Sequence, residues 1–107
     1  MTIHRILHYL GLTENYKGYW QLYSAIRLAY QNPKKLTNIV KEIYEVVAQE
    51  YNCSVYCIER NIRTLILKIW VNNKEELFAI TQITLSTPPT VSNFISFIIF
   101  NILRKHL

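Results

Sequence analysis

Apolar residues recur at steps of three and four positions along most of this chain, and this spacing places side chains on one face of an α-helix. The longest periodic run covers residues 55–72, and its apolar stripe consists of Val55, Ile58, Ile62, Leu65, Ile66 and Ile69. Shorter runs cover residues 3–10, 17–31, 36–50 and 74–80, and a last segment ends near residue 106. The pattern predicts an all-α fold of about six helices.

Residues that stop or cap helices stand at the ends of these runs. Gly11 follows the first run and suits the left-handed conformation that commonly ends a helix. Asn52 can serve as a similar stop after the third run, and Ser54 is a favourable N-cap for the longest one. The last helix has two possible N-caps, Thr90 and Ser92.

The segment that ends at residue 72 has the organisation of a helix-turn-helix. A short run over residues 43–49, a turn of about four residues and the long run 55–72 match its element lengths. Opposite the apolar stripe, the beginning of the long helix carries Tyr56, Glu59, Arg60, Arg63 and Thr64. Arginine can contact guanine in a bidentate manner, and glutamate can accept a hydrogen bond from cytosine. A solvated face with Glu59 paired to Arg63 would show the same spacing, so the pattern leaves both interpretations open.

Composition narrows the class of protein. The 107 residues suit one domain, 1–107. Twelve Lys and Arg against seven acidic residues give a net charge of +5, which suits a polyanionic partner without proving one. The chain opens without a signal peptide, and the apolar run 94–103 is too short to span a bilayer. Because the two cysteines accompany no export signal, we expect a reduced, cytoplasmic protein without a membrane partner.

Catalytic and metal-binding patterns are weak. A Gly-rich phosphate loop and a nucleophile with a local base are missing from the sequence, so we expect no enzyme, no cofactor and no small-molecule substrate. His4 and His8 stand four residues apart, as do Cys53 and Cys57, which is formally a zinc-binding set. The two pairs lie far apart in sequence and lack a tight C-x2-C motif. We therefore expect a surface histidine pair, two reduced thiols and no metal.

Several short motifs, taken together, carry a resemblance that covers essentially the whole chain. They are Ile6-Leu7-His8 with Gly11, Tyr16-Lys17-Gly18-Tyr19, Ala25-Ile26, Tyr44, Ala48, Ile58-Glu59-Arg60-Asn61-Ile62-Arg63, Trp70, Pro89-Thr90 with Ser92, Phe94-Ile95 and Leu103. As a set they resemble the C-terminal effector domain of the stage-zero sporulation response regulator (protein A) family, transcription factors of endospore-forming bacteria. The resemblance implies a six-helix domain with a helix-turn-helix that binds a short operator box in double-stranded DNA, often as tandem copies.

The resemblance also implies roles for individual residues. Glu59, Arg60 and Arg63 stand where the family places its recognition contacts, so residues 55–72 become the expected recognition helix in the major groove. Lys68 lies further along this helix and suits a phosphate contact, while Ser54 and Tyr56 complete the expected DNA-binding set. Residues 53–57 depart from the family, which usually has small hydroxyl residues and a basic one there. The 107 residues include no receiver domain, which fits either an excised domain or a free-standing effector-like protein.

The last predicted helix is apolar around most of its circumference, and such a helix is either buried or paired with a partner. Both faces cannot easily point inward in so small a domain. We therefore predict self-association, as a homodimer, through Phe94, Phe97, Ile98, Phe100 and Ile102. Plain core packing of this helix is the alternative. A second functional hypothesis follows from the same helix: an interaction module that binds or sequesters a partner regulator.

Overall fold

The computed structural model describes residues 2–103, apart from the side chains of residues 101 and 102. Within this range the chain is helical and contains no strand, which confirms the predicted all-α class. The elements are α1 (Ile3–Tyr9), α2 (Tyr19–Gln31), the 3-10 helix η1 (Pro33–Asn38), the π-helix η2 (Val40–Tyr44), α3 (Glu45–Glu50), α4 (Val55–Asn72), α5 (Lys74–Thr81), α6 (Val91–Ile98) and the π-helix η3 (Ile99–Leu103).

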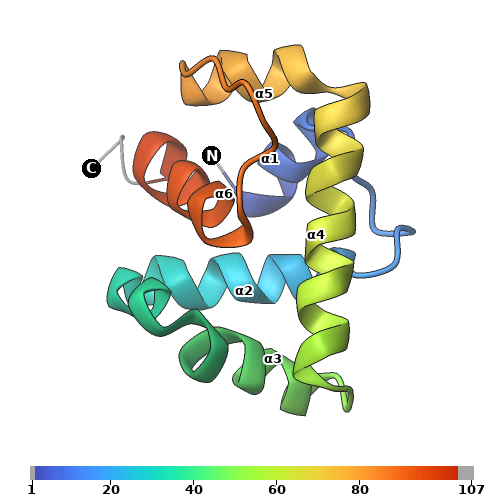
Figure 1. Cartoon of the computed structure of the whole chain (residues 1–107), viewed down its shortest axis with the longest axis vertical. Helices are drawn as coiled ribbons and strands as arrows, with labels where there is room; N and C mark the ends of the chain where they lie inside the picture. Colours follow the sequence, from blue (N-terminus) through green and yellow to red (C-terminus); the bar gives the residue numbers. More distant parts are fainter. Residues whose placement is uncertain (1, 104–107) are drawn as a thin grey trace.

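The long helix α4 runs along one side of the molecule, and α2, η2, α3, α5 and α6 pack against it (Figure 1). Helices α2 and α3 meet its N-terminal half, and α5 follows its C-terminal end. Helix α6 lies between α2 and α5 and also contacts α4. This arrangement holds α4 by one face and leaves the opposite face to solvent.

Every α-helix contributes side chains to one hydrophobic core. Leu7, Tyr19, Ile26, Ile62 and Phe94 are among its fully buried members. The apolar stripe predicted for α4 is confirmed at Ile58, Ile62, Leu65, Ile66 and Ile69, which are all buried, whereas Val55 is only partly buried.

The backbone angles and capping hydrogen bonds show helix ends at the predicted positions. Gly11 has a φ of +92° and ends α1 in a Schellman motif, since the N–H of Leu12 donates to the carbonyl of Leu7 at 2.9 Å. Asn52 has a φ of 53°, and the Ser54 hydroxyl accepts from the N–H of Cys57 at 3.1 Å. Thr90, and not Ser92, is the N-cap of α6.

The run 36–50, predicted as one helix, is divided into η1, η2 and α3. A regular α-helix would place Val40 on the same face as Ile43 and Val47. The π-helical turn contains one more residue, which changes the register before α3 begins. As a result Ile43 and Val47 are fully buried, while Val40 is 47% exposed.

Gly18 lies where the start of α2 packs closely against α4. Its φ is +87°, and an added Cβ atom would lie 2.8 Å from the Cβ of Asn61. Asn61 is itself buried and donates to the Gln21 side chain at 3.0 Å, so it has little freedom to move away.

Replacing Gly18 by Ala is expected to lower the free energy of unfolding by about 1–3 kcal/mol, because a side chain would be both strained and in steric conflict. Urea denaturation monitored by circular dichroism measures this. Asn15→Ala, at an exposed position of the same loop, is the control and should change stability by less than about 0.5 kcal/mol. Equal stability of Gly18→Ala and the parent would show that the loop adapts.

Candidate nucleic-acid interface

The helix-turn-helix is built from α3, a four-residue turn over 51–54, and α4, as predicted. The turn is fixed to the body of the domain by its first residue. The Tyr51 hydroxyl contacts the hydroxyl of Ser24 at 3.3 Å and donates to the backbone carbonyl of Trp20 at 3.2 Å. Both partners lie on α2, so the turn and the start of α4 are held in a defined position.

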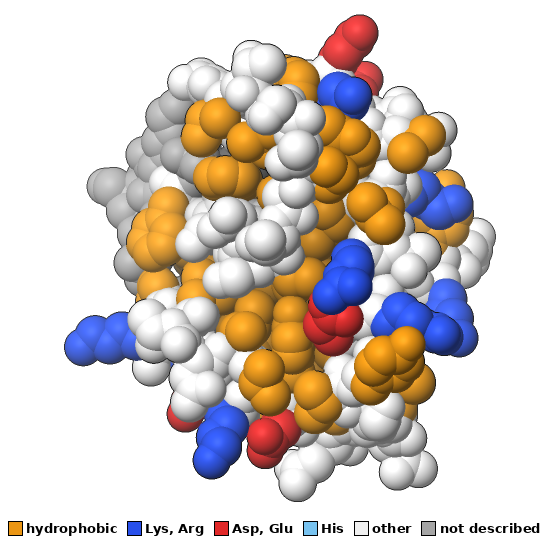
Figure 2. All heavy atoms as spheres, in the orientation of Figure 1, with side chains coloured by type: hydrophobic (Ala, Val, Ile, Leu, Met, Phe, Trp, Pro, Cys, Tyr) orange, Lys and Arg blue, Asp and Glu red, His pale blue; other side chains and the backbone are white. Residues whose placement is uncertain are grey.

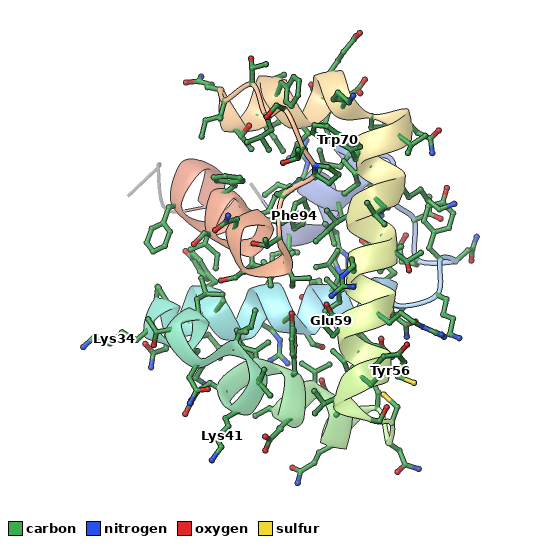
Figure 3. The ribbon with its side chains drawn as sticks, in the orientation of Figure 1. Lys34, Lys41, Tyr56, Glu59, Trp70 and Phe94 are labelled. Carbon is green, nitrogen blue, oxygen red and sulfur yellow. The ribbon has the colours of Figure 1, made fainter. Side chains whose placement is uncertain are left out.

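A stripe of exposed side chains follows the outer face of α4 from its first turn. Tyr56 is 68% exposed, and Arg60, Arg63, Thr64 and Lys68 are also exposed. Tyr56 lies near the turn and Glu59 one helical turn further along (Figure 3). Most side chains of the predicted strip are exposed, but Glu59 is only partly exposed, and the apolar Leu67 and Val71 of α4 are exposed as well.

Positively charged side chains lie beside the first turn of α4. Arg60 lies over the ring of Tyr56, with its guanidinium carbon 5.8 Å from the ring centre. A hydrogen bond from the Ser54 side chain lowers the pKa of the Cys57 thiol, and the nearby charges of Arg60 and Lys17 lower it further. An anionic group is therefore favoured at this end of the helix.

Glu59 and Arg63 form an ion pair within one turn of α4. The Glu59 side chain is 25% exposed, against 63% for Arg63, so the carboxylate is the inner member of the pair. Burial raises the pKa of the adjacent Tyr44 to about 12, and the charge of Glu59 adds to this rise. The pairing that the sequence left as an alternative is thus present, and it holds the Arg63 guanidinium on the outer face.

The Glu59–Arg63 pair borders a groove of about 510 Å³ between α4 and the start of α6. Hydrophobic side chains gather along this face of the molecule (Figure 2). The groove lining includes Tyr44, Leu67, Pro88, Pro89 and Val91.

The loop between α1 and α2 forms the other border of the exposed stripe. Lys68 lies over the ring of Tyr16, with Nζ 4.7 Å from the ring centre. The next residue, Lys17, is exposed, and its positive charge lowers the pKa of the Cys57 thiol. The periodicity of α4 could not reveal Lys17, because this residue reaches the interface through the fold of a different segment. The Tyr16-Lys17-Gly18-Tyr19 motif was the available signal.

Residues 3–102 match the family described as "Sporulation initiation factor Spo0A C terminal". The chain belongs to this family. The Spo0A C-terminal domain is a helical DNA-binding domain of a transcription regulator of sporulation, so the all-helical fold and the family agree. The resemblance stated from the sequence motifs is confirmed, and with it the class of DNA-binding transcription regulator.

The last helix of this Spo0A C-terminal domain corrects part of the predicted self-association surface. Phe94 and Ile98 are fully buried, so these two residues belong to the core and not to an exposed self-association surface. The reason is that α6 is enclosed by α2 and α4, and its continuation η3 by α2 and α5. Phe97 is partly exposed and Phe100 is 50% exposed. The side chain of Ile102 lies outside the described residues.

Two further observations concern the remaining sequence expectations. Within residues 2–103, no helix is both long and apolar enough to cross a membrane. Cys53 and Cys57 are free, partly buried thiols, and Cys53 accepts a weak contact from the Gln21 amide at 3.9 Å.

Proposed function

We propose that this domain binds double-stranded DNA in a sequence-specific manner, with α4 as the recognition helix in the major groove. The observation that carries the proposal is the exposed stripe of Tyr56, Arg60 and Arg63 at the start of α4. It directly follows a turn that is fixed to α2, which is the arrangement that presents the beginning of a recognition helix to base edges. Membership in the Spo0A C-terminal family supports the same function.

Several side chains of this surface have a proposed contact. Arg60 reads guanine through a bidentate hydrogen bond, and Glu59 accepts from cytosine. Arg63, which Glu59 orients, contacts a base or a phosphate. The Ser54 hydroxyl accepts from the N–H of Cys57 and contacts a phosphate by donating to it the hydrogen that otherwise bonds the Cys57 thiol. Lys68, with Lys17 beside it in the loop, contacts the DNA backbone.

Selection of bound sequences from a random pool of DNA duplexes tests the proposed function. We expect enrichment of a short common site, tighter binding to that site than to a shuffled duplex, and affinity that falls with increasing salt. Recovery of unrelated sequences, with equal affinity for the selected and shuffled duplexes, would contradict sequence-specific binding.

We further propose that two copies associate, either in solution as a dimer or side by side on DNA, with Phe97 and Phe100 at the contact. The support is an aromatic side chain, Phe100, that is half exposed at the end of α6. The same surface supports the second candidate function, a module that binds a partner regulator. Such a module would form a hetero-complex and show weak affinity for every duplex in the pool.

Replacing Lys68 by Ala is expected to weaken binding to all duplexes by a similar factor, because a phosphate contact carries no sequence information. The slope of log K against log salt should become smaller by about 1. Fluorescence anisotropy at several salt concentrations measures both. Lys41→Ala removes the same charge from a side chain of η2 that points away from α4 (Figure 3), and should leave affinity and slope nearly unchanged. Loss confined to the selected duplex would instead assign Lys68 to base reading.

A further inference from the structure

A cluster of potential metal ligands lies where α1 meets the loop before α2. His4 and His8 are four residues apart on α1, and Glu14 comes from the loop. One ligand atom from each residue lies within 4.8 Å of the other two. Among the described residues, neither cysteine belongs to this set. The two histidines therefore lie beside Glu14, and not beside Cys53 and Cys57 as the formal zinc-binding set in the sequence would require.

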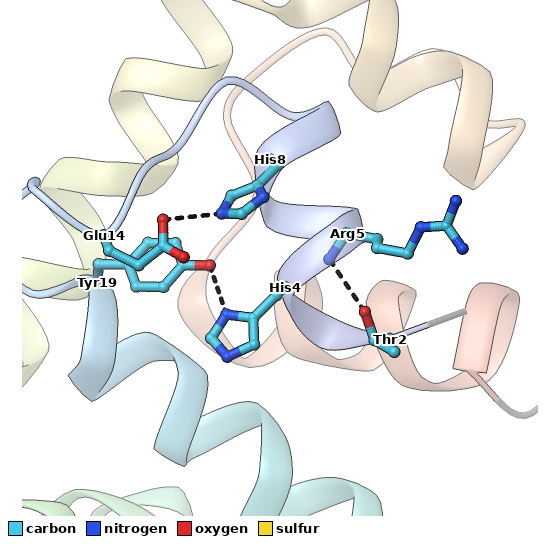
Figure 4. Close-up of polar contacts among 6 residues, drawn as sticks. All are labelled: Thr2, His4, Arg5, His8, Glu14 and Tyr19. Atoms are coloured by element: carbon cyan, nitrogen blue, oxygen red, sulfur yellow. Dashed lines mark hydrogen bonds and ion pairs between the residues drawn. The ribbon is translucent and has the colours of Figure 1, made fainter.

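The cluster is already ordered by polar contacts (Figure 4). His8 Nε2 and Glu14 Oε1 are 2.9 Å apart, and His4 Nδ1 lies 2.8 Å from the Tyr19 hydroxyl. The backbone and the His8 contact lower the pKa of the Glu14 carboxyl, so this group is an anion at neutral pH. Arg5 points to the other side of α1, which keeps its charge away from the cluster.

Aromatic side chains of α2 fix the orientation of the His4 ring. The ring stacks on Tyr23 with centres 4.3 Å apart and planes 12° apart, and it meets the edge of Trp20 at 5.2 Å. The Nδ1 atom of His4 faces the Tyr19 hydroxyl on the side of α1 where Glu14 also lies (Figure 4), and an ion bound at this nitrogen would replace the contact with Tyr19.

We propose that His4, His8 and Glu14 bind a divalent transition-metal ion, with zinc as the representative. Two imidazoles and a carboxylate form a known three-ligand zinc set that leaves a fourth position open to water. Zinc–ligand bonds of about 2.0–2.1 Å separate tetrahedral ligand atoms by roughly 3.3 Å. The side chains therefore need to close by roughly 1.5 Å at most, starting from the separation of up to 4.8 Å. The carboxylate balances part of the ion's charge.

The position of the cluster determines how a metal ion reaches it and which segment the bound ion stabilises. The side chains of His8 and Glu14 are 47% and 44% exposed, so an ion reaches them directly from solvent. A bound ion connects α1 to the loop that leads to α2. The same loop carries Tyr16 and Lys17, which border the exposed stripe of α4. Metal binding therefore stabilises a segment beside the candidate DNA surface, although the proposal does not depend on DNA binding.

Calorimetric titration of the chelator-treated full chain with zinc chloride tests the proposal. We expect one ion per chain, and a zinc-dependent rise in the melting temperature. His8→Gln and Glu14→Gln should each lower the affinity about tenfold or more, since each removes one of three ligands. Both positions are half exposed, so these variants should fold, which circular dichroism checks.

Matched variants exclude the other donors in the chain. Cys53→Ser with Cys57→Ser removes the thiols, and His106→Gln removes the remaining histidine. These changes should leave both the stoichiometry and the affinity as in the parent. The proposal is overturned if the parent shows no saturable binding. It is equally overturned if binding survives the combined His8→Gln and Glu14→Gln changes, or if it disappears with the cysteines or His106.

Discussion

Replacing Ile98 by Glu is expected to unfold the domain, whereas the same replacement at Phe100 is expected to leave it folded. Ile98 is completely buried in the core between α6 and its neighbours, while Phe100 is 50% exposed. A buried carboxylate without a partner costs about 4–5 kcal/mol or more, which is comparable with the total stability of about 5–15 kcal/mol of a typical domain. At Phe100 the carboxylate remains in water, and only part of an apolar contact is lost.

The same two variants separate self-association from core packing. Circular dichroism and urea denaturation report folding, and sedimentation velocity reports the assembly state. We expect the parent to sediment as a dimer at high micromolar concentration and Phe100→Glu as a folded monomer. Val71→Glu introduces the same charge at a position of α4 that is 76% exposed, and should leave the dimer intact. A monomeric parent, or loss of folding in Phe100→Glu, would show that the last helix serves core packing alone.

The sequence predicted those parts of the fold that depend on local rules. Gly11 and Ser54 end and begin helices through contacts with residues a few positions away, so their roles could be assigned without a structure. The exposure of Val40 could not be predicted in this way, because a π-helical turn changes the helical register. The burial of Phe94 and Ile98 could not be predicted from the sequence either. Periodicity shows that a helix is apolar on all sides, but the elements that enclose it come from other parts of the chain.

In the candidate sites, too, some residues can be grouped from their spacing in the sequence, while others are brought together only by the fold. Tyr56, Arg60 and Arg63 share one helix, so their common face follows from spacing alone. Lys17 reaches this surface through the loop before α2. Glu14 reaches the two histidines in a similar way, and no periodic pattern connects them.

Partial burial of a side chain also could not be predicted from the sequence. Glu59 and Arg60 are neighbours in a charged strip and look equivalent there, yet Glu59 is the inner residue beside Tyr44. That difference makes Arg60 the freer of the two for contact with DNA.

Replacing Arg60 by Ala is therefore expected to cost about 1–3 kcal/mol of binding free energy at the selected site and to relax the preference at one guanine. The side chain is exposed and near the start of α4, and its recorded contact is with the ring of Tyr56, which is itself exposed. Anisotropy titrations against the selected duplex and against duplexes changed at each position measure both effects. Arg5→Ala, which removes the same charge from α1, should bind as the parent does.

The Arg60→Lys variant separates base reading from simple charge attraction. Lysine keeps the positive charge but lacks the planar, two-pronged donor arrangement that matches guanine. If Arg60 reads a base, Lys should recover affinity for non-specific DNA and much less of the discrimination at the guanine. If Arg60 contacts a phosphate, Lys should restore binding to all duplexes equally, and Arg60→Ala should weaken all of them by the same factor. Unchanged affinity of Arg60→Ala for the selected site would remove Arg60 from the interface and leave Arg63 as the arginine of α4 to test.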